Sequence, residues 1–542
     1  MKNKKINGAK KEFVWMIILS VVVLLPNIFL LFYGSDALPV ALLLFGLSCL
    51  FFLLPALFLR KRIFFILHGV FVLLAPLEMA HIYLNLTPAT SAFLLSIIDT
   101  NQEESFELLS AIKFPLVILF LLWAFYFIIV VVRIKNVCLF QSKRTKWAGI
   151  FIFAGAIIAG YAVGYNKKIY PYDLILRTYQ AFAVKKEIKK GGEQMKDFKF
   201  NAVKKDPVAG KEIYVFVIGE TGRYSSYAIN GYQRNTSPML AQTKNVVSYT
   251  DFYSEANITS SSLPVILTRA SARDYERSYV EKSFVDAFRE AGFKTYWIAG
   301  QSANNKFIRR ISGDADGEYF RTVNFSDTTN FDEQLWLYLD DVLAKNDHKA
   351  LIVIHTLGSH FRYNYRYPAS YEVFKPSLKG AFDYALISAK NKELFVNTYD
   401  NSILYTDFFL AKTIRKINRL HAISALVYVA DHGENLFDTK ENIVFHGGSD
   451  YTHYDFHVPF FVWTSDEYSV QYPCKQENIR CNKDEKLSAH YIFYSILDIA
   501  DITFPGQILS KSIASETLRG DSVRYIINTN MEVLRFPTKS RI

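Results

Sequence analysis

Apolar residues are concentrated in the first third of the chain, in stretches long enough to cross a lipid bilayer. Five stretches each hold roughly the 20 apolar residues that a spanning helix needs; they lie at Phe13–Tyr33, Leu38–Leu59, Ile63–Leu84, Pro115–Val132 and Trp147–Val163. The basic leader Met1–Ile6 also fits a signal peptide, but the first stretch is longer than the usual apolar part of one, and four more follow. The pattern predicts a transmembrane domain of five helices over residues 1–164.

Lysine and arginine residues indicate how these helices are oriented. They cluster at the start of the chain, at Arg60–Arg62 after the second stretch, and at Arg133–Lys146 before the fifth. Because basic loops stay in the cytoplasm, all three clusters are expected on that side of the membrane. Five spans then place everything after about Gly164 on the outer side.

The rest of the chain changes its pattern twice. Residues 165–210 are basic and mixed, and the periodic segment Tyr172–Phe182 predicts a linker helix, either lying at the membrane surface or serving as a plain amphipathic connector. From residue 211 to 542, short β-rich stretches alternate with helical ones, which predicts an α/β domain with a mainly parallel central sheet. The predicted strands are Tyr214–Ile218, Thr295–Ala299, Ala350–His355, Ala425–Ala430 and Val458–Trp463, and the predicted helices include Val280–Ala291, Glu333–Ala344 and Val396–Ile417.

Charged side chains follow two of the predicted strands directly. Glu220 comes after Ile213–Ile218 and Gly219, and Asp431 and His432 come after Ser424–Ala430. The carboxyl ends of parallel strands meet in one crevice, so these side chains are expected to lie together. An Asp-His pair alone is often a helix cap beside a surface histidine, but carboxylates buried together are costly without a cation. Two carboxylates and an imidazole therefore predict a divalent metal site, with zinc as a normal occupant.

A candidate nucleophile lies where a polar segment becomes an apolar helix-like one. Thr259, followed by Ser260–Ser262, begins that segment, and a hydroxyl at a helix N-terminus faces unpaired amide donors that favour a phosphate or an oxyanion. An ordinary helix N-cap accounts for the same pattern.

Composition narrows the class of protein. The chain is 51% hydrophobic, too apolar for an ordinary soluble protein, and its net charge of +11 is explained largely by the cytoplasmic basic clusters rather than by a nucleic-acid surface. Cys474 and Cys481 lie in the exported part, where an oxidising exterior predicts a disulfide between them. Two free thiols are the alternative.

Several motifs in one order resemble the phosphoethanolamine transferases, membrane-anchored members of the alkaline phosphatase and sulfatase superfamily. The motifs are Gly219–Thr221, Asn230–Pro238, Thr259 with Leu263–Pro264, Gly358–His360, Tyr399–Asp407 and Asp431–Glu434. The resemblance covers both the five-span anchor and the catalytic domain.

The resemblance implies roles for individual residues. A zinc ion would be bound by Glu220, Thr259, Asp431 and His432, with Thr259 as the nucleophile and Ser260–Ser262 as its alternatives. Side chains implied to contact substrate, or in the case of the two histidines a second zinc, are His360, His446, Lys306, Thr100, Asn101 and Glu104.

The implied activity is transfer of phosphoethanolamine from phosphatidylethanolamine to lipopolysaccharide, by a monomer in the bacterial inner membrane with its catalytic domain in the periplasm. Relatives that modify lipid A have cysteines on either side of their nucleophile. This chain has Glu255, Ala256 and Val265 near the nucleophile instead, so lipid A and a core sugar are both candidate acceptors. Glycerol phosphate transfer, as in lipoteichoic acid synthesis, and a non-catalytic polymer-binding protein are the alternatives. A sulfatase is disfavoured because no Cys or Ser begins the maturation motif of those enzymes.

Overall fold

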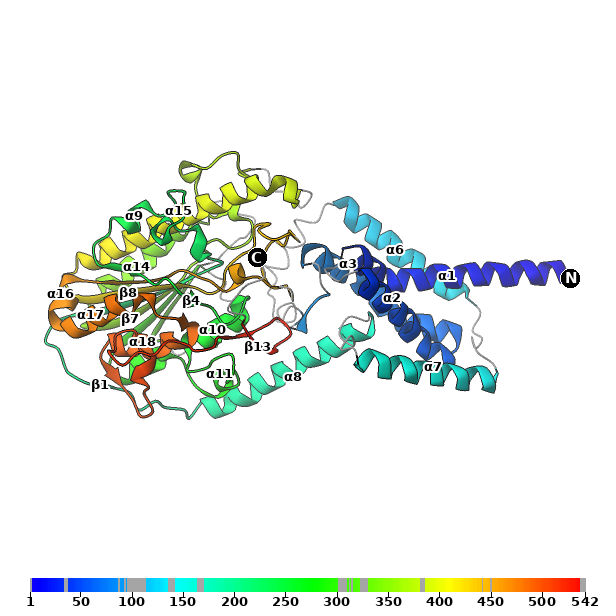
Figure 1. The fold of residues 1–542 in the computed structure, drawn as a ribbon, viewed down its shortest axis with the longest axis horizontal. Coiled ribbons are helices and arrows are strands. Elements are labelled where there is room, and N and C mark those ends of the chain that lie inside the picture. Colours follow the sequence, from blue (N-terminus) through cyan, green and yellow to red (C-terminus); the bar gives the residue numbers. More distant parts are fainter. Residues whose placement is uncertain are drawn as a thin grey trace. The chain divides into compact units, whose positions relative to one another are not determined.

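The chain forms two compact units (Figure 1). The computed structural model describes residues 2–33, 38–85, 88–91, 94, 114–134, 142–162, 170–300, 310, 312, 315–321, 330–380, 386–440, 442–448 and 451–536. The first unit is built mainly from the described residues up to Ala183, and the second mainly from those after it.

The first unit is helical. Each of the five apolar stretches forms a helix, so the helices predicted there are confirmed; they are α1 (Lys2–Tyr33), α2 (Leu38–Leu53), α3 (Lys61–Asn85), α6 (Phe114–Arg133) and α7 (Lys143–Ala162). Helices α1, α2, α3 and α6 share a core that includes Val23, Phe52, Phe64, Val72 and Phe127. The predicted linker helix is α8 (Tyr172–Met195).

The outer surface of this unit is apolar. Large side chains such as Phe32, Phe125 and Phe151 are exposed, which suits a surface covered by lipid. Within the described residues, the helical stretch Lys61–Met79 is long and apolar enough to cross a bilayer; shorter apolar helical stretches are Ser20–Tyr33, Leu38–Phe52 and Trp123–Arg133. The number of membrane spans therefore stays a prediction.

The second unit is built around a seven-stranded sheet with the order β3-β9-β8-β2-β7-β5-β6. Its strands are β2 (Glu212–Gly219), β3 (Val246–Ser248), β5 (Lys294–Ala299), β6 (Gly317–Phe320), β7 (Lys349–His355), β8 (Ile423–Ala430) and β9 (Phe460–Thr464). Strands β8, β2, β7, β5 and β6 are parallel, and β9 runs antiparallel to both of its neighbours. The mainly parallel sheet is confirmed, with β9 making it a mixed one.

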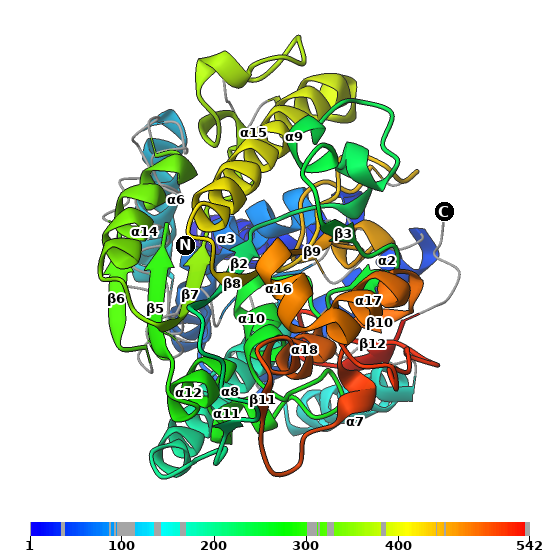
Figure 2. The ribbon, with the colours of Figure 1, turned by 90° about the vertical axis from the view of Figure 1, so that its left-hand side faces the viewer.

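Helices cover both faces of this sheet, which explains why its central strands are continuous apolar runs. Helices α10 (Thr259–Leu267), α12 (Phe284–Glu290) and α18 (Ile492–Ile499) pack on one face around Phe216 and Val427. The long helix α15 (Lys392–Asn418) lies on the other face (Figure 2). The strands are thereby fixed, and so are the side chains that follow them.

One predicted helix is broken in the structure. The predicted helix Val280–Ala291 is two helices, α11 (Arg277–Val280) and α12, because Glu281 and Ser283 have extended backbones. Ser283 is the residue immediately before α12, and serine is a favoured residue at that position of a helix.

The predicted disulfide is not formed. Cys474 and Cys481 are both free and exposed, and both belong to α17 (Pro473–Cys481). Seven residues of helix separate their Cα atoms by about 10 Å, whereas a disulfide needs Cα atoms about 4.4–6.8 Å apart. The short, polar sequence between them forms a helix rather than the loop that the prediction required.

Phe216→Ala tests how strongly the sheet depends on its covered face. Phe216 is fully buried and its ring lies 5.0 Å from that of Phe284, so we expect the free energy of unfolding to fall by about 3–5 kcal/mol. Denaturant titration of the second unit's fluorescence would measure it. Leu337→Ala, which truncates a side chain that is 69% exposed, should change stability by less than about 0.5 kcal/mol. Equal effects of the two substitutions would contradict this assignment of the core.

Candidate metal centre

The register of β2 and β8 brings the two carboxylates together. Gly219, the last residue of β2, is paired with Ala430, the last residue of β8. Glu220 and Asp431 are the next residues of the two strands, and the Asp431 amide donates to the Gly219 carbonyl at 3.0 Å. Both side chains are buried, at 2% and 0% exposure. The predicted convergence of strand ends is confirmed.

Backbone hydrogen bonds orient Asp431 and His432. Asp431 Oδ1 accepts from the amides of Thr221 at 3.0 Å and His432 at 2.8 Å, which leaves Oδ2 on the other side of the carboxylate. His432 Nδ1 lies 2.9 Å from the Gly433 carbonyl. If Nδ1 carries the proton, it donates to this carbonyl, and the lone pair of Nε2 points away from the backbone. Nε2 lies 3.4 Å from Asp431 Oδ2 and 3.5 Å from Glu220 Oε1.

Thr259 completes the group from a third element. It is the first residue of α10, whose residues Leu263–Leu267 are buried and anchor the helix in the core. Its Oγ1 lies 3.3 Å from each Glu220 oxygen and 3.3 Å from His432 Nε2. The residues Glu220, Asp431, His432 and Thr259 are called the metal centre below.

Two of the three neighbouring serine hydroxyls have other partners. Ser262 Oγ donates to the Ala256 carbonyl at 3.0 Å, and Ser261 Oγ faces the Met531 sulfur at 3.9 Å. Pro264 lacks the N–H that would bond the Ser260 carbonyl, and the Tyr275 hydroxyl faces that carbonyl at 3.5 Å instead. At this helix start it is the Thr259 hydroxyl that contacts Glu220 and His432.

The distances fit a tetrahedral cation site. Ligand atoms about 2.1 Å from a shared zinc ion lie about 3.4 Å from one another, and the contacts within the metal centre are 3.3–3.5 Å. Asp431 Oδ2 is buried with no hydrogen-bond partner among the described residues. Such an orphaned oxygen is costly unless a cation meets it. The residues present therefore fit a zinc ion.

Without a cation, these charges perturb one another. Burial and the nearby Glu220 charge raise the pKa of Asp431 to about 6. Burial opposes protonation of His432, but Asp431 and Glu220 outweigh it and raise the pKa of His432 to about 10. The pocket thus attracts positive charge, and a bound dication would supply it in place of the imidazolium proton.

Two predicted substrate residues lie beside the metal centre. The His446 ring is 4.0 Å from the His432 ring, and His446 Nδ1 is 3.2 Å from Glu434 Oε1. His360 follows Ser359, whose amide donates to the Glu220 carbonyl at 3.0 Å. Burial lowers the pKa of His360 to about 4, so its ring is neutral at pH 7. The other four predicted substrate residues, Lys306, Thr100, Asn101 and Glu104, lie outside the described residues.

Two further buried residues belong to this region and were not predicted. Glu434 is fully buried, accepts from the Tyr363 hydroxyl at 2.7 Å and faces His446. His355 ends β7 opposite Ile218, and neither of its ring nitrogens has a hydrogen-bond partner within the described chain. Both carried a signal: Glu434 continues the Asp431-His432-Gly433 motif, and His355, like His432, stands at the end of an apolar run that predicts a strand.

Comparison with known proteins identifies the family to which the chain belongs. The family model described as sulfatase matches residues 212–502, more than half of the chain. The chain belongs to the sulfatase family. A relative of this sulfatase-family chain, the Kdo(2)-lipid A phosphoethanolamine 7''-transferase of Salmonella typhimurium strain LT2, is 34% identical over 275 residues. That alignment covers 48% of this chain and 46% of the relative.

Solved structures extend the likeness to the whole chain. The integral membrane lipooligosaccharide phosphoethanolamine transferase A (EptA) of Neisseria meningitidis matches with a TM-score of 0.73 and 22% identity, over 92% of this chain and 98% of that one. The C-terminal periplasmic domain of EptC from Escherichia coli, in complex with zinc, matches with a TM-score of 0.55 and 25% identity, over 61% and 92%. The sulfatase-family chain therefore has the same fold as these two proteins.

Asp431→Asn should weaken zinc binding. The amide keeps the shape of the side chain but removes the charge that a dication needs, so we expect at least a tenfold loss of zinc affinity, or about 1.4 kcal/mol. Competition with a chromogenic chelator would measure it. Asp340→Asn, at an exposed surface pair with Lys416, is the matched control and should bind zinc as the wild type does. Equal affinity of the two variants would exclude Asp431 as a ligand.

Gly433→Ala should disturb the metal centre through the backbone. A Cβ at Gly433 would lie 1.8 Å from the Tyr454 carbonyl oxygen, so the chain after His432 must move, at a cost of about 1–3 kcal/mol. We expect a lower Tm together with reduced zinc content. Gly192→Ala, where the added Cβ meets nothing within 4 Å, should retain both. Normal zinc content in Gly433→Ala would show that the close backbone approach does not position His432.

Proposed function

We propose that this protein is a zinc-dependent phosphoethanolamine transferase that modifies lipopolysaccharide. The observation that carries the proposal is the position of Thr259 Oγ1, 3.3 Å from both Glu220 and His432. A hydroxyl among metal ligands at a helix N-terminus is suited to nucleophilic attack on phosphorus. The names of the Salmonella and Neisseria relatives supply the group and the class of acceptor.

In the proposed first half-reaction, Thr259 Oγ1 bonds to the phosphorus of phosphatidylethanolamine and the bond from phosphorus to the glycerol oxygen breaks. The hydroxyl proton of Thr259 ends on that oxygen, and diacylglycerol leaves. In the second half-reaction an acceptor oxygen bonds to the phosphorus, the bond to Thr259 breaks, and the acceptor's proton returns to Oγ1. Both half-reactions balance without a further reactant.

The residues around Thr259 take specific roles in this proposal. Glu220, Asp431 and His432 hold Thr259 and the ion; a bound zinc would favour the alkoxide of Thr259 and offset charge on the phosphoryl oxygens. His360 and His446 contact the phosphoethanolamine group and move protons. Buried Glu434 holds His446 through its Nδ1, while the ring of His446 lies 4.0 Å from that of His432.

The first unit supports the placement of this chemistry. Its exposed apolar helices fit an anchor in a bacterial inner membrane, with the catalytic unit in the periplasm. An anchored enzyme meets lipid donor and lipid acceptor at the same surface, which raises their effective concentration. The predicted contacts of Thr100, Asn101, Glu104 and Lys306 with substrate, the number of zinc ions, the monomeric state and the choice between lipid A and a core sugar stay predictions.

Intact-mass measurement after incubation with phosphatidylethanolamine tests the proposal. We expect wild type to gain one phosphoethanolamine group on the peptide that contains Thr259, and Thr259→Ala to gain none. Ser260→Ala is the matched control, because Ser260, like Thr259, is only partly buried at this helix start, and it should form the adduct normally. An adduct with the mass of glycerol phosphate would favour the lipoteichoic-acid type of transfer. A zinc-loaded wild type that forms no adduct would contradict the proposal.

A further inference from the structure

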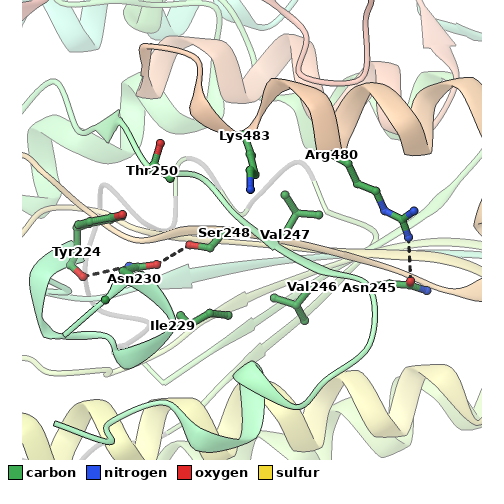
Figure 3. A pocket seen from close by; sticks show the side chains of 11 residues that line it. Tyr224, Ile229, Asn230, Asn245, Val246, Val247, Ser248, Thr250, Arg480 and Lys483 are labelled. Atoms are coloured by element: carbon green, nitrogen blue, oxygen red, sulfur yellow. Dashed lines mark hydrogen bonds between the residues drawn. The ribbon is translucent and has the colours of Figure 1, made fainter. Parts of the chain in front are cut away.

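A second polar cavity lies at the β3 edge of the sheet. Its volume is about 720 Å³, within the roughly 300–1,000 Å³ that small-ligand sites occupy. It is lined by β3, by the segment Tyr224–Gly231 that follows Glu220, by Arg480 in the last turn of α17 and by Lys483 in the 3-10 turn after it (Figure 3). This space is called the β3 cavity below, and none of its lining residues belongs to the metal centre.

The two cations of the β3 cavity lack acidic partners. Arg480 Nη2 donates to Asn245 Oδ1 at 3.1 Å and makes no ion pair with any described residue. Lys483 is exposed, and its ammonium contacts no acid in the part of the chain that is described. Carboxylates adjoin the lining without being part of it: Asp484 accepts from the Thr250 hydroxyl at 3.0 Å, and Asp466 accepts from Asn245 Nδ2 at 3.0 Å. The residues that line the cavity therefore include two cations and no carboxylate, and an anion would complement these cations.

Hydrogen bonds hold the polar walls in place. Asn230 Nδ2 donates to the Tyr224 carbonyl at 3.0 Å, and Asn230 Oδ1 accepts from the Ser248 hydroxyl at 2.5 Å. Asn245 is fixed from the other side, because its Nδ2 donates to Asp466 Oδ1 at 3.0 Å while its oxygen orients Arg480 (Figure 3). A site whose polar groups are already ordered binds with less entropic cost.

An aromatic stack connects the cavity with the approach to the nucleophile. The Tyr224 ring is stacked 4.0 Å from His457, and His457 is stacked 4.6 Å from Tyr253. Tyr253 ends β4 (Phe252–Tyr253), six residues before Thr259. The segment that follows β2 thus contributes Glu220 to the metal centre and Tyr224–Gly231 to the cavity wall.

We propose that the β3 cavity binds a phosphorylated sugar of the acceptor, with phosphate at Arg480 and Lys483 and sugar hydroxyls at the amide and hydroxyl side chains. The inference rests on the proposed function for the identity of the acceptor. An added peptide strand is the competing occupant of a sheet edge. The observations favour the sugar, because β3 is three residues long and the Thr250 amide beyond it already donates to the Lys483 carbonyl at 2.9 Å.

Ligand-detected NMR titration of full-length protein in detergent tests the binding, with glucose 6-phosphate as probe. Arg480→Glu/Lys483→Glu should weaken its binding by tenfold or more, on the order of the loss of one charge-assisted hydrogen bond. Lys390→Glu/Arg419→Glu, which makes the same charge change at exposed residues outside the cavity, should bind like wild type. Equal binding by both double variants, or equal affinity for unphosphorylated glucose, would overturn the proposal. So would binding of an extended apolar hexapeptide in place of the sugar.

Separate measurement of the half-reactions distinguishes this inference from the proposed function. With phosphorylated lipid A as acceptor, the KM for acceptor should rise about tenfold or more in Arg480→Glu/Lys483→Glu. The double variant should form the Thr259 adduct at the wild-type rate but transfer the group from it to the acceptor more slowly. Unchanged KM would overturn the role of the cavity while leaving the transferase intact. A wild type that forms no adduct would instead remove the proposed function, and the glucose 6-phosphate titration would still decide whether the cavity binds anionic sugars.

Discussion

The parallel register of β2 and β8 is the constraint on which the metal centre depends. Pairing of Gly219 with Ala430 makes Glu220 and Asp431 adjacent, 211 positions apart in sequence and both buried. Two buried carboxylates repel each other and lose their hydration, so this arrangement is unfavourable unless positive charge stands between them. The helix cover on both faces of the sheet holds the register against that repulsion. Packing of the core thus holds together two carboxylates that destabilise the fold but favour the binding of a cation.

The central part of this arrangement could be predicted from the sequence. Continuous apolar runs mark strands that are buried on both faces, and a charged residue immediately after such a run has few other places to lie than the strand-end crevice. That reasoning located Glu220, Asp431 and His432. Thr259 needed the motif resemblance as well, because its local pattern is shared by ordinary helix starts; tertiary contacts separate its hydroxyl from those of Ser261 and Ser262.

Other features could not be read from local pattern. Strands β3 and β6 are three and four residues long and have no distinctive apolar run, so they exist as strands through pairing with their neighbours. The break between α11 and α12 depends on the extended backbones of Glu281 and Ser283 within a sequence of good helical period. The Cys474–Cys481 prediction was wrong because compartment and spacing say nothing about whether the intervening residues form a helix.

The position of Arg480 and Lys483 at the sheet edge also bears on self-association. An edge strand such as β3 offers backbone groups to the edge of another copy, and β-sheet proteins commonly prevent this with short edges and charged side chains. Two copies that met at β3 would bring the same cations face to face, so like-charge repulsion opposes the pairing. This edge would therefore keep the second units of neighbouring copies from joining their sheets.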